Sequence, residues 1–283
     1  MNARVGGSRS RGGIPVWSED ALTARARLVW SSGDFLPIAR SFAAGAEEYV
    51  GRLRLSPGES VLDVACGTGN VAIPAARAGA TVTGVDIAPN LVARARAEAR
   101  AAGCRVQFDV GDAEALPYAI GQFDTTASMF GVMFAHRPDR AVAELIRVTR
   151  HGGRIALANW TAEGVVGKLL RAHREAAPLP AGVPSPLDWG DAALVRERFG
   201  DRVSSLACTP RMMELRFPFP PAAVTELFTT CYGPTVVALR GVDPAAASRL
   251  RDELTRLFQK YNRAADDTTV VAAEYLDVQA RVA

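Results

Sequence analysis

The sequence has little of what metal-binding, disulfide-linked or membrane-spanning proteins need. It holds four cysteines and three histidines, and no two cysteines form a Cys-x-x-Cys pair. We therefore predict neither a metal site nor a disulfide framework. No run of about 18 apolar residues occurs, so no membrane-spanning helix is expected. The basic segment 1–15 is not followed by an apolar stretch, so it does not resemble a secretory signal, and the expected compartment is the cytoplasm.

Positive charge is also scarce outside one short segment. The chain has 33 Lys and Arg residues against 30 Asp and Glu, and Arg4, Arg9 and Arg11 lie in the first 15 residues, where there is no acid. The remaining basic and acidic residues therefore balance. A nucleic-acid-binding protein normally carries a basic face on its fold, so no nucleic-acid partner is predicted. Residues 1–15 are expected to form a disordered tail.

What the sequence does have is a regular alternation of strand-like and helical segments. Apolar strands are predicted at 60–66, 81–87, 105–112, 123–132 and 152–160, with helices at 70–80, 89–103 and 138–150. Strands that alternate with helices indicate βαβ units and a parallel sheet. Beyond this core, a helix is predicted from the Ser18 cap, two long helical stretches between 221 and 264, and strands near 204–219 and 268–283.

The first strand ends in a glycine-rich turn, VLDVACGTGN at 61–70. Gly67 and Gly69 let the backbone approach a ligand with no Cβ between them. About twenty residues further on, the second strand ends at Asp86, the spacing of a carboxylate that accepts from both hydroxyls of a ribose. The ligand is therefore predicted to contain a nucleoside. The alternatives are that Asp86 caps a helix and that Asp63 pairs with an arginine in the core.

Two nucleoside cofactors suit such a turn. A dinucleotide site uses G-x-G-x-x-G, and GTGNVA has Ala72 in place of the third glycine, which a looser form tolerates. Asp63 would be unfavourable beside an anionic pyrophosphate and favourable beside a cation. S-adenosylmethionine carries an ammonium and a sulfonium group, so we prefer it, and NAD remains the alternative.

Several motifs in order resemble those of the class I S-adenosylmethionine-dependent methyltransferases. They are LDVACGTGN, GVDI, VGDAEALPY and FDTTASMFGVMF, followed by LIRVTRHGGRIAL. Ala65 stands where the commoner form has its first glycine, and His151 where proline is usual. The resemblance implies an α/β fold: a Rossmann-like, mostly parallel seven-stranded sheet with helices on both faces. It places the cofactor-binding core at 56–160, an N-terminal helical lid at 16–55, and a helical cap with the last strands at 161–283.

The resemblance also implies a set of cofactor-binding residues. Asp63, Ala65, Gly67 and Gly69 would hold the methionine end, Asp86 and Ile87 the ribose, Asp112 and Ala113 the adenine, and Phe130 and Gly131 the sulfonium side, with Trp30 and Gly33 folded over the ligand. The cofactor would be S-adenosylmethionine, its product S-adenosylhomocysteine, and no metal is expected.

Residues for the methyl acceptor are predicted on the ligand edge of the sheet and in the second half. His136, in AHRPDR, resembles a histidine that takes the acceptor's proton in small-molecule O-methyltransferases. The alternative is a surface histidine that caps the helix beginning at Pro138. Candidates for the substrate pocket are Trp160, His173, Trp189, Phe228 and Tyr232, although the four large aromatic residues among them are more often core than pocket.

The predicted function is methyl transfer to an oxygen or carbon of a small, largely apolar secondary metabolite. The resemblance suggests bacterial natural-product chemistry on a terpenoid, indole or glycosylated compound, with C-methylation coupled to cyclisation as an option. A nicotinamide-dependent oxidoreductase and a non-catalytic protein that binds the cofactor or its demethylated product are the alternatives. No membrane partner is expected, and a homo-oligomer is possible through the N-terminal helix.

Overall fold

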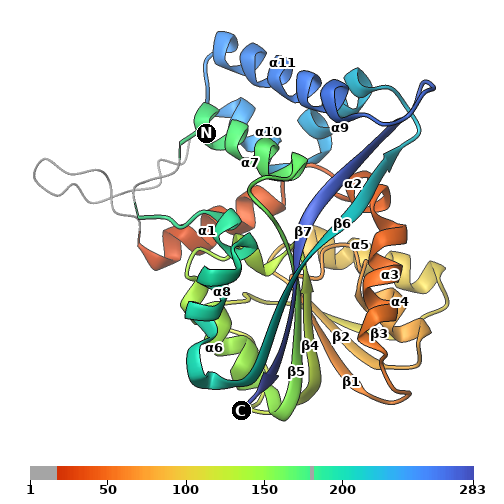
Figure 1. Cartoon of the computed structure of the whole chain (residues 1–283), viewed down its shortest axis with the longest axis vertical. Coiled ribbons are helices and arrows are strands. Elements are labelled where there is room, and N and C mark those ends of the chain that lie inside the picture. Colours follow the sequence, from red (N-terminus) through yellow and green to blue (C-terminus); the bar gives the residue numbers. More distant parts are fainter. Residues whose placement is uncertain (1–17, 179–181) are drawn as a thin grey trace, which may run out of the picture.

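A computed structural model describes residues 18–178 and 182–283 (Figure 1). The predicted disordered tail, residues 1–15, lies outside the described residues. Within them, seven strands form one sheet in the order β3-β2-β1-β4-β5-β7-β6. The strands are β1 (Ser60–Val64), β2 (Thr81–Asp86), β3 (Val106–Val110), β4 (Phe123–Met129), β5 (Thr149–Trp160), β6 (Val203–Phe217) and β7 (Thr269–Val282). The predicted Rossmann-like fold is confirmed.

The sheet is parallel except at one edge. β1 pairs in parallel with β2 and β4, and β7 runs antiparallel to both β5 and β6. The central position of β1 follows from its composition, because Val61, Leu62 and Val64 are fully buried on both faces of the strand. Strand order reverses between β1 and β4, and in open α/β sheets ligands bind at that switch point, beyond the carboxyl ends of the strands.

Helices cover both faces of the sheet, as predicted. α3 (Ala43–Leu53), α4 (Ala72–Arg77) and α5 (Pro89–Ala101) lie on one side, and α6 (Pro138–Val148) and α8 (Ala192–Phe199) on the other (Figure 1). The α6 sequence explains its orientation, since Ala141, Val142, Leu145 and Val148 recur at helical spacing and are all buried.

Further helices lie beyond the carboxyl ends of the parallel strands. α1 (Glu19–Trp30) and α2 (Leu36–Ser41) precede the core, and α7 (Val165–Ala176) follows β5. α9 (Pro221–Cys231), α10 (Gly233–Arg240) and α11 (Pro244–Tyr261) separate β6 from β7. In Figure 1, α7, α9, α10 and α11 lie together at one end of the molecule, where the long strands β6 and β7 reach them.

Helix ends follow the local sequence. Ser18 caps α1 by accepting a hydrogen bond from the Ala21 amide, as predicted. The two helices expected between 221 and 264 are three, because Pro234, in the first turn of α10, has no N–H to continue α9. Among the described helices, none is long and apolar enough to span a membrane. The described residues also include three short 3₁₀ segments: η1 (Val132–Phe134), η2 (Pro186–Gly190) and η3 (Gly200–Arg202).

Candidate functional site

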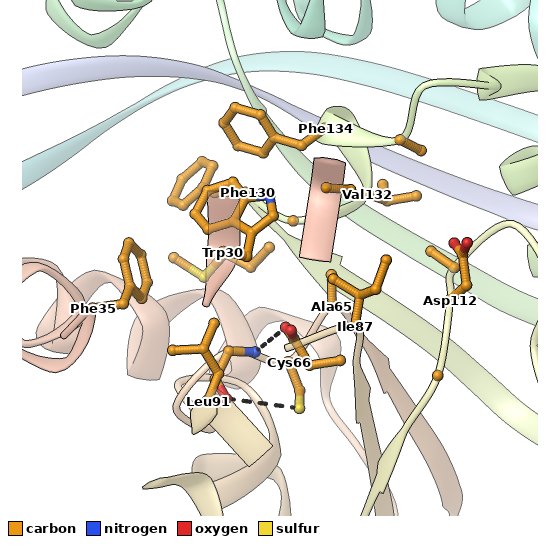
Figure 2. Close-up of a pocket in the computed structure, with 18 of the residues that line it drawn as sticks. Trp30, Phe35, Ala65, Cys66, Ile87, Leu91, Asp112, Phe130, Val132 and Phe134 are labelled. Carbon is orange, nitrogen blue, oxygen red and sulfur yellow. Dashed lines mark hydrogen bonds between the residues drawn. The ribbon is translucent and has the colours of Figure 1, made fainter. Parts of the chain in front are cut away.

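A cavity with about 920 Å³ of empty space, its open mouth included, lies at the switch point (Figure 2). Much of its lining comes from the carboxyl ends of four parallel strands and the turns after them: 65–68 at β1, 86–87 at β2, 111–114 at β3 and 129–132 at β4. α1 and the segment after it cover the cavity with Thr23, Ala26, Trp30 and Phe35. In Figure 2, Asp112 lies across the cavity from Phe35. We refer to this space as the first cavity.

The glycine-rich turn presents backbone to the first cavity. Gly67 lines it with φ +54°, and a Cβ built on Gly67 would meet only ring carbons of Phe35, at 3.9 Å. Any side chain at this position would therefore project into the space. Gly69 also has a positive φ, +95°, but it does not line the first cavity, and its added Cβ would lie 3.0 Å from Ile73 Cδ1. Gly69 thus shapes the turn into α4.

Two residues other than glycine adopt left-handed backbone conformations beside this turn. Ala65 has φ +55° and Phe130 has φ +56°, and both line the first cavity. Gly131 follows Phe130, and a Cβ on it would lie 2.6 Å from Ala65 Cβ. The turns after β1 and β4 are therefore in direct contact. Strained conformations of this kind persist where the surrounding structure fixes them, commonly at ligand sites.

Asp86 connects the glycine-rich turn to the end of β2. Its carboxylate is buried and accepts hydrogen bonds from the Gly67 amide (2.9 Å) and the Ala88 amide (2.9 Å). Burial raises the pKa of Asp86 to about 6. Each carboxylate oxygen has a second lone pair, so Asp86 can still accept from a ligand in the first cavity, which it lines.

Asp63 does not line the first cavity, contrary to the prediction. Its carboxylate is 1% exposed and accepts a hydrogen bond from the Ala72 amide at the start of α4 (2.9 Å). Within the described part of the chain it has no arginine partner either. Burial raises the pKa of Asp63 to about 8. The Asp63 side chain points from the central strand β1 into the layer between the sheet and α4. Its hydrogen bond to Ala72 therefore stabilises the start of α4, next to the glycine-rich turn.

The charged residues that line the first cavity are acidic. They are Asp86, Asp112 and Glu114, and the lining residues described include no lysine or arginine. Asp112 accepts hydrogen bonds from the Glu114 amide (2.9 Å) and from Thr23 Oγ1 (3.3 Å), while Glu114 forms an ion pair with Arg137. The first cavity therefore suits a ligand that carries positive charge and hydroxyl donors, and it is unfavourable for phosphates.

A second cavity, with about 1460 Å³ of empty space including its open mouth, adjoins the first. It lies among α1, α7 and α10, and it shares Ala26, Trp30, Phe134 and His136 with the lining of the first cavity. Trp30 and Phe134 pack edge to face with ring centroids 4.8 Å apart. His136 therefore stands at the boundary between the two cavities.

His136 does not cap α6, so that alternative is wrong: the N-cap residue is Arg137, and no side chain caps this end. Burial lowers the pKa of His136 below its ordinary value of 6.5, with Glu114 opposing the change and Arg25 adding to it. The imidazole is therefore neutral at pH 7 and able to accept a proton.

Comparison with known proteins decides the family. A family model described as a methyltransferase domain matches residues 61–153. An uncharacterised protein of Mycobacterium tuberculosis strain H37Rv is 40% identical over 252 residues, which cover 87% of this chain and 92% of that protein. The methyltransferase GfsG of Streptomyces halstedii is 38% identical over 141 residues, or 48% of this chain and 50% of its own. The chain belongs to the class I S-adenosylmethionine-dependent methyltransferases.

The solved structure of the cyclase SpnF shares the fold of this methyltransferase, with a TM-score of 0.57, 22% identity, and coverage of 96% of this chain and 99% of that one. The residues of the first cavity fit the family's cofactor. Bare backbone at Gly67 suits its amino-acid end, and an acidic lining suits a ligand with positive charge and hydroxyl groups. In the part of the chain that the structure describes, no group of three or more His, Cys, Asp or Glu could hold a metal ion.

The structure brings most of the predicted cofactor residues together. Those that line the first cavity are Trp30, Ala65, Gly67, Asp86, Ile87, Asp112, Ala113, Phe130 and Gly131. Besides Asp63 and Gly69, Gly33 lies outside it. Gly33 has φ +84°, and a Cβ on it would be 2.5 Å from the carbonyl oxygen of Cys231. It is glycine because α9 packs directly against this turn.

Of the substrate-pocket candidates, only His173 lines the second cavity of the methyltransferase. Trp160, Trp189, Phe228 and Tyr232 line neither cavity and are at most 6% exposed. Trp160 stacks behind Phe130 at a centroid distance of 3.5 Å and an angle of 8°. Large aromatic side chains are buried in the core here, so their prediction as pocket residues is corrected.

Sequence reasoning missed other lining residues. In the first cavity these include Thr23, Ala26, Phe35, Leu91 and Phe134, and in the second Arg25, Arg171 and Arg174. Phe134 had a usable signal, because it stands two residues before His136 on the ligand edge of the sheet. The arginines had none, since arginine is spread through the whole sequence.

Proposed function

We propose that the methyltransferase binds S-adenosylmethionine in the first cavity and methylates an oxygen or carbon of a small acceptor held in the second. The observation that carries this proposal is the wall shared by the two cavities at Ala26, Trp30, Phe134 and His136. A reacting atom of the acceptor can approach the first cavity there. When bound, the cofactor supplies a methyl group that is already activated for displacement.

In this proposal, different residues of the first cavity bind different parts of the cofactor. Asp86 accepts from the ribose through its free lone pairs, while Gly67 and Ala65 offer backbone to the methionine end. Ile87, Asp112 and Ala113 hold the adenine, Phe130 and Gly131 border the sulfonium, and Trp30 covers the ligand. Three further predicted residues do not contact the cofactor in this proposal but hold in place the turns that carry the residues that do: Asp63, Gly69 and Gly33.

His136 is proposed as the general base. A hydroxyl nucleophile must lose its proton, and a neutral imidazole at the boundary of the cavities can accept it. The other task of the chain is alignment with exclusion of water, which the aromatic wall of Trp30 and Phe134 supports. Methylation of an electron-rich carbon needs the base only afterwards, to remove a proton.

The acceptor is proposed to be a small, largely apolar secondary metabolite. Apolar side chains supply most of the second cavity's lining, including Val29 of α1, Leu170 of α7, and Val237 and Ala238 of α10. A terpenoid, indole or glycosylated acceptor and coupled cyclisation remain predictions. An oxidoreductase is disfavoured because the acidic residues that line the first cavity, Asp86, Asp112 and Glu114, would repel an anionic pyrophosphate.

Calorimetric titration with S-adenosylmethionine, S-adenosylhomocysteine and NAD tests the proposal. We expect micromolar binding of the first two and none of NAD. Asp86→Ala should abolish binding, and Ala113→Trp, which fills the cavity from another turn and removes no hydrogen bond of Asp86, should do the same in a folded protein. Binding of NAD alone would refute the proposal. Binding of the cofactor without turnover over a broad acceptor panel would favour a non-catalytic protein.

A further inference from the structure

The two cavities carry opposite charge. The first is lined by three acidic residues and no described arginine, whereas the second is lined by Arg25, Arg171 and Arg174 and by no described Asp or Glu. The rest of the second cavity is largely apolar. Guanidinium groups beside apolar surface are costly unless they meet water or an anion, so this arrangement favours a ligand with both an apolar and an anionic part.

Arg171 is the arginine best placed to meet such an anion. It is half-buried on α7, and its guanidinium forms no hydrogen bond or ion pair with any described residue. Arg174 is more exposed and already donates to the carbonyl oxygen of Val183 (3.2 Å). Arg25, on α1, lies close enough to His136 to lower its pKa. The planar fork of Arg171 can bind two oxygens of one oxyanion.

His173 gives an independent indication of a ligand. It lines the second cavity, is 7% exposed, and its Nε2 lies 2.8 Å from Thr235 Oγ1. Its Nδ1 is buried and has no hydrogen-bond partner among the described residues. Burial lowers the pKa of His173 to about 4, so the ring is neutral. A buried polar atom without a partner is unfavourable, and a polar group on a bound ligand would satisfy it.

We propose that the second cavity takes an acceptor with an apolar body and a carboxylate or phosphate group that pairs with Arg171. This inference rests on the proposed function and narrows its substrate class. The apolar body would lie against Leu170 and Val237, with the methylated atom at His136. The anion is a recognition group rather than the methylated atom, because α7 contributes no residue to the lining of the first cavity.

Binding of simple probes tests this inference. Octanoate, octyl phosphate and octan-1-ol are titrated into wild-type protein saturated with S-adenosylhomocysteine, and into Arg171→Gln and Arg171→Lys. Arg100→Gln is the matched control, since Arg100 is an exposed arginine on α5 outside both cavities. We expect an anionic probe to bind at least about tenfold more tightly than the alcohol, and Arg171→Gln to remove that advantage without changing alcohol binding.

Arg171→Lys should retain part of the advantage, because it keeps the charge but not the two-pronged geometry. The tighter of the two anionic probes identifies the oxyanion. No binding of either anionic probe, equal binding of the alcohol, or an unchanged affinity in Arg171→Gln would overturn the inference. If S-adenosylhomocysteine binds in these experiments, only the acceptor class has failed. If it does not bind to wild-type protein, the proposed function itself has failed.

Discussion

Gly67→Ala separates the role of the glycine-rich turn in ligand binding from its role in folding. Gly67 has φ +54° and lines the first cavity, where an added Cβ would have only Phe35 nearby, at 3.9 Å. Gly103, at the end of α5, has φ +67°, has nothing within 4 Å of an added Cβ, and lies outside the cavity. Gly103→Ala therefore reproduces the backbone strain without filling the site.

The expected change in stability is similar for both variants. Alanine in the left-handed region costs roughly 1–2 kcal/mol. Its smaller conformational freedom in the unfolded chain offsets about 0.4–1 kcal/mol of that cost. Each variant should therefore lose about 1 kcal/mol of unfolding free energy, or about 2–4 °C in Tm. In Gly67→Ala the methyl group also occupies space against the backbone, so affinity for S-adenosylhomocysteine should fall at least about tenfold.

Calorimetric titration and thermal unfolding measure the two effects on the same samples. The reasoning requires equal losses of Tm and a loss of affinity confined to Gly67→Ala. Equal affinity in the two variants would show that no ligand approaches the backbone at Gly67. A much larger loss of Tm in Gly67→Ala would mean that the glycine serves the fold rather than the site.

Three further substitutions test other parts of the site. His136→Gln should lower kcat with a hydroxyl acceptor by about a hundredfold or more. In wild-type protein the rate should fall below pH 6.5 as His136 becomes protonated, and the variant should lack that fall. An unchanged pH–rate profile would exclude His136 as the base. Asp63 has a folded pKa of about 8, above the unfolded value of 3.8, so its contribution to stability is complete below 3.8 and is lost as pH rises through 8. Between these two pKa values the free energy of unfolding should fall as pH rises, by at most about 1.4 kcal/mol per pH unit. Asp63→Asn should flatten this slope, measured by urea unfolding between pH 5 and 8. An unaltered slope would contradict the raised pKa of Asp63. Glu19 is exposed and pairs with the partly buried Arg137 (2.7 Å) and the exposed Arg140 (2.8 Å), so Glu19→Gln should cost less than about 1 kcal/mol of stability. It should nevertheless speed dissociation of S-adenosylhomocysteine severalfold in stopped-flow displacement. An unchanged dissociation rate would show that α1 does not retain the ligand.

The sequence predicted the parts of the site that depend on local backbone geometry. A strand, two spaced glycines and a helix fix where the chain turns, and the run from Gly67 to Asp86 places the carboxylate beside that turn. Ala65 keeps the left-handed conformation even though it is not glycine. The spacing of apolar residues and the residue types that form turns are properties of short segments, so they can be interpreted without knowledge of the tertiary structure.

The sequence could not show whether a given side chain would point into the core or into a cavity. Asp63 and Asp86 are both acids on adjacent strands, yet one supports α4 and the other lines the first cavity. Trp160 is the last residue of β5, at the ligand edge, but its ring stacks on Phe130 and lines neither cavity. The second cavity is assembled from α1, α7 and α10, which are far apart in the chain, so its arginines had no shared pattern.

The element that connects the two cavities is also weakly packed. α1 supplies Thr23 to the first cavity, Arg25 and Val29 to the second, and Trp30 to both, yet it buries no residue of its own. An element with little buried surface opens more readily than the core, as ligand-covering segments must. The family match at 61–153 spans β1 to the start of β5 but none of α1, α7 or α10. Family membership therefore accounts for the cofactor, whereas the cavity proposed for the acceptor is built from helices that lie outside the matched domain. Substitutions in α1 should accordingly change which acceptor is used before they change how stable the protein is.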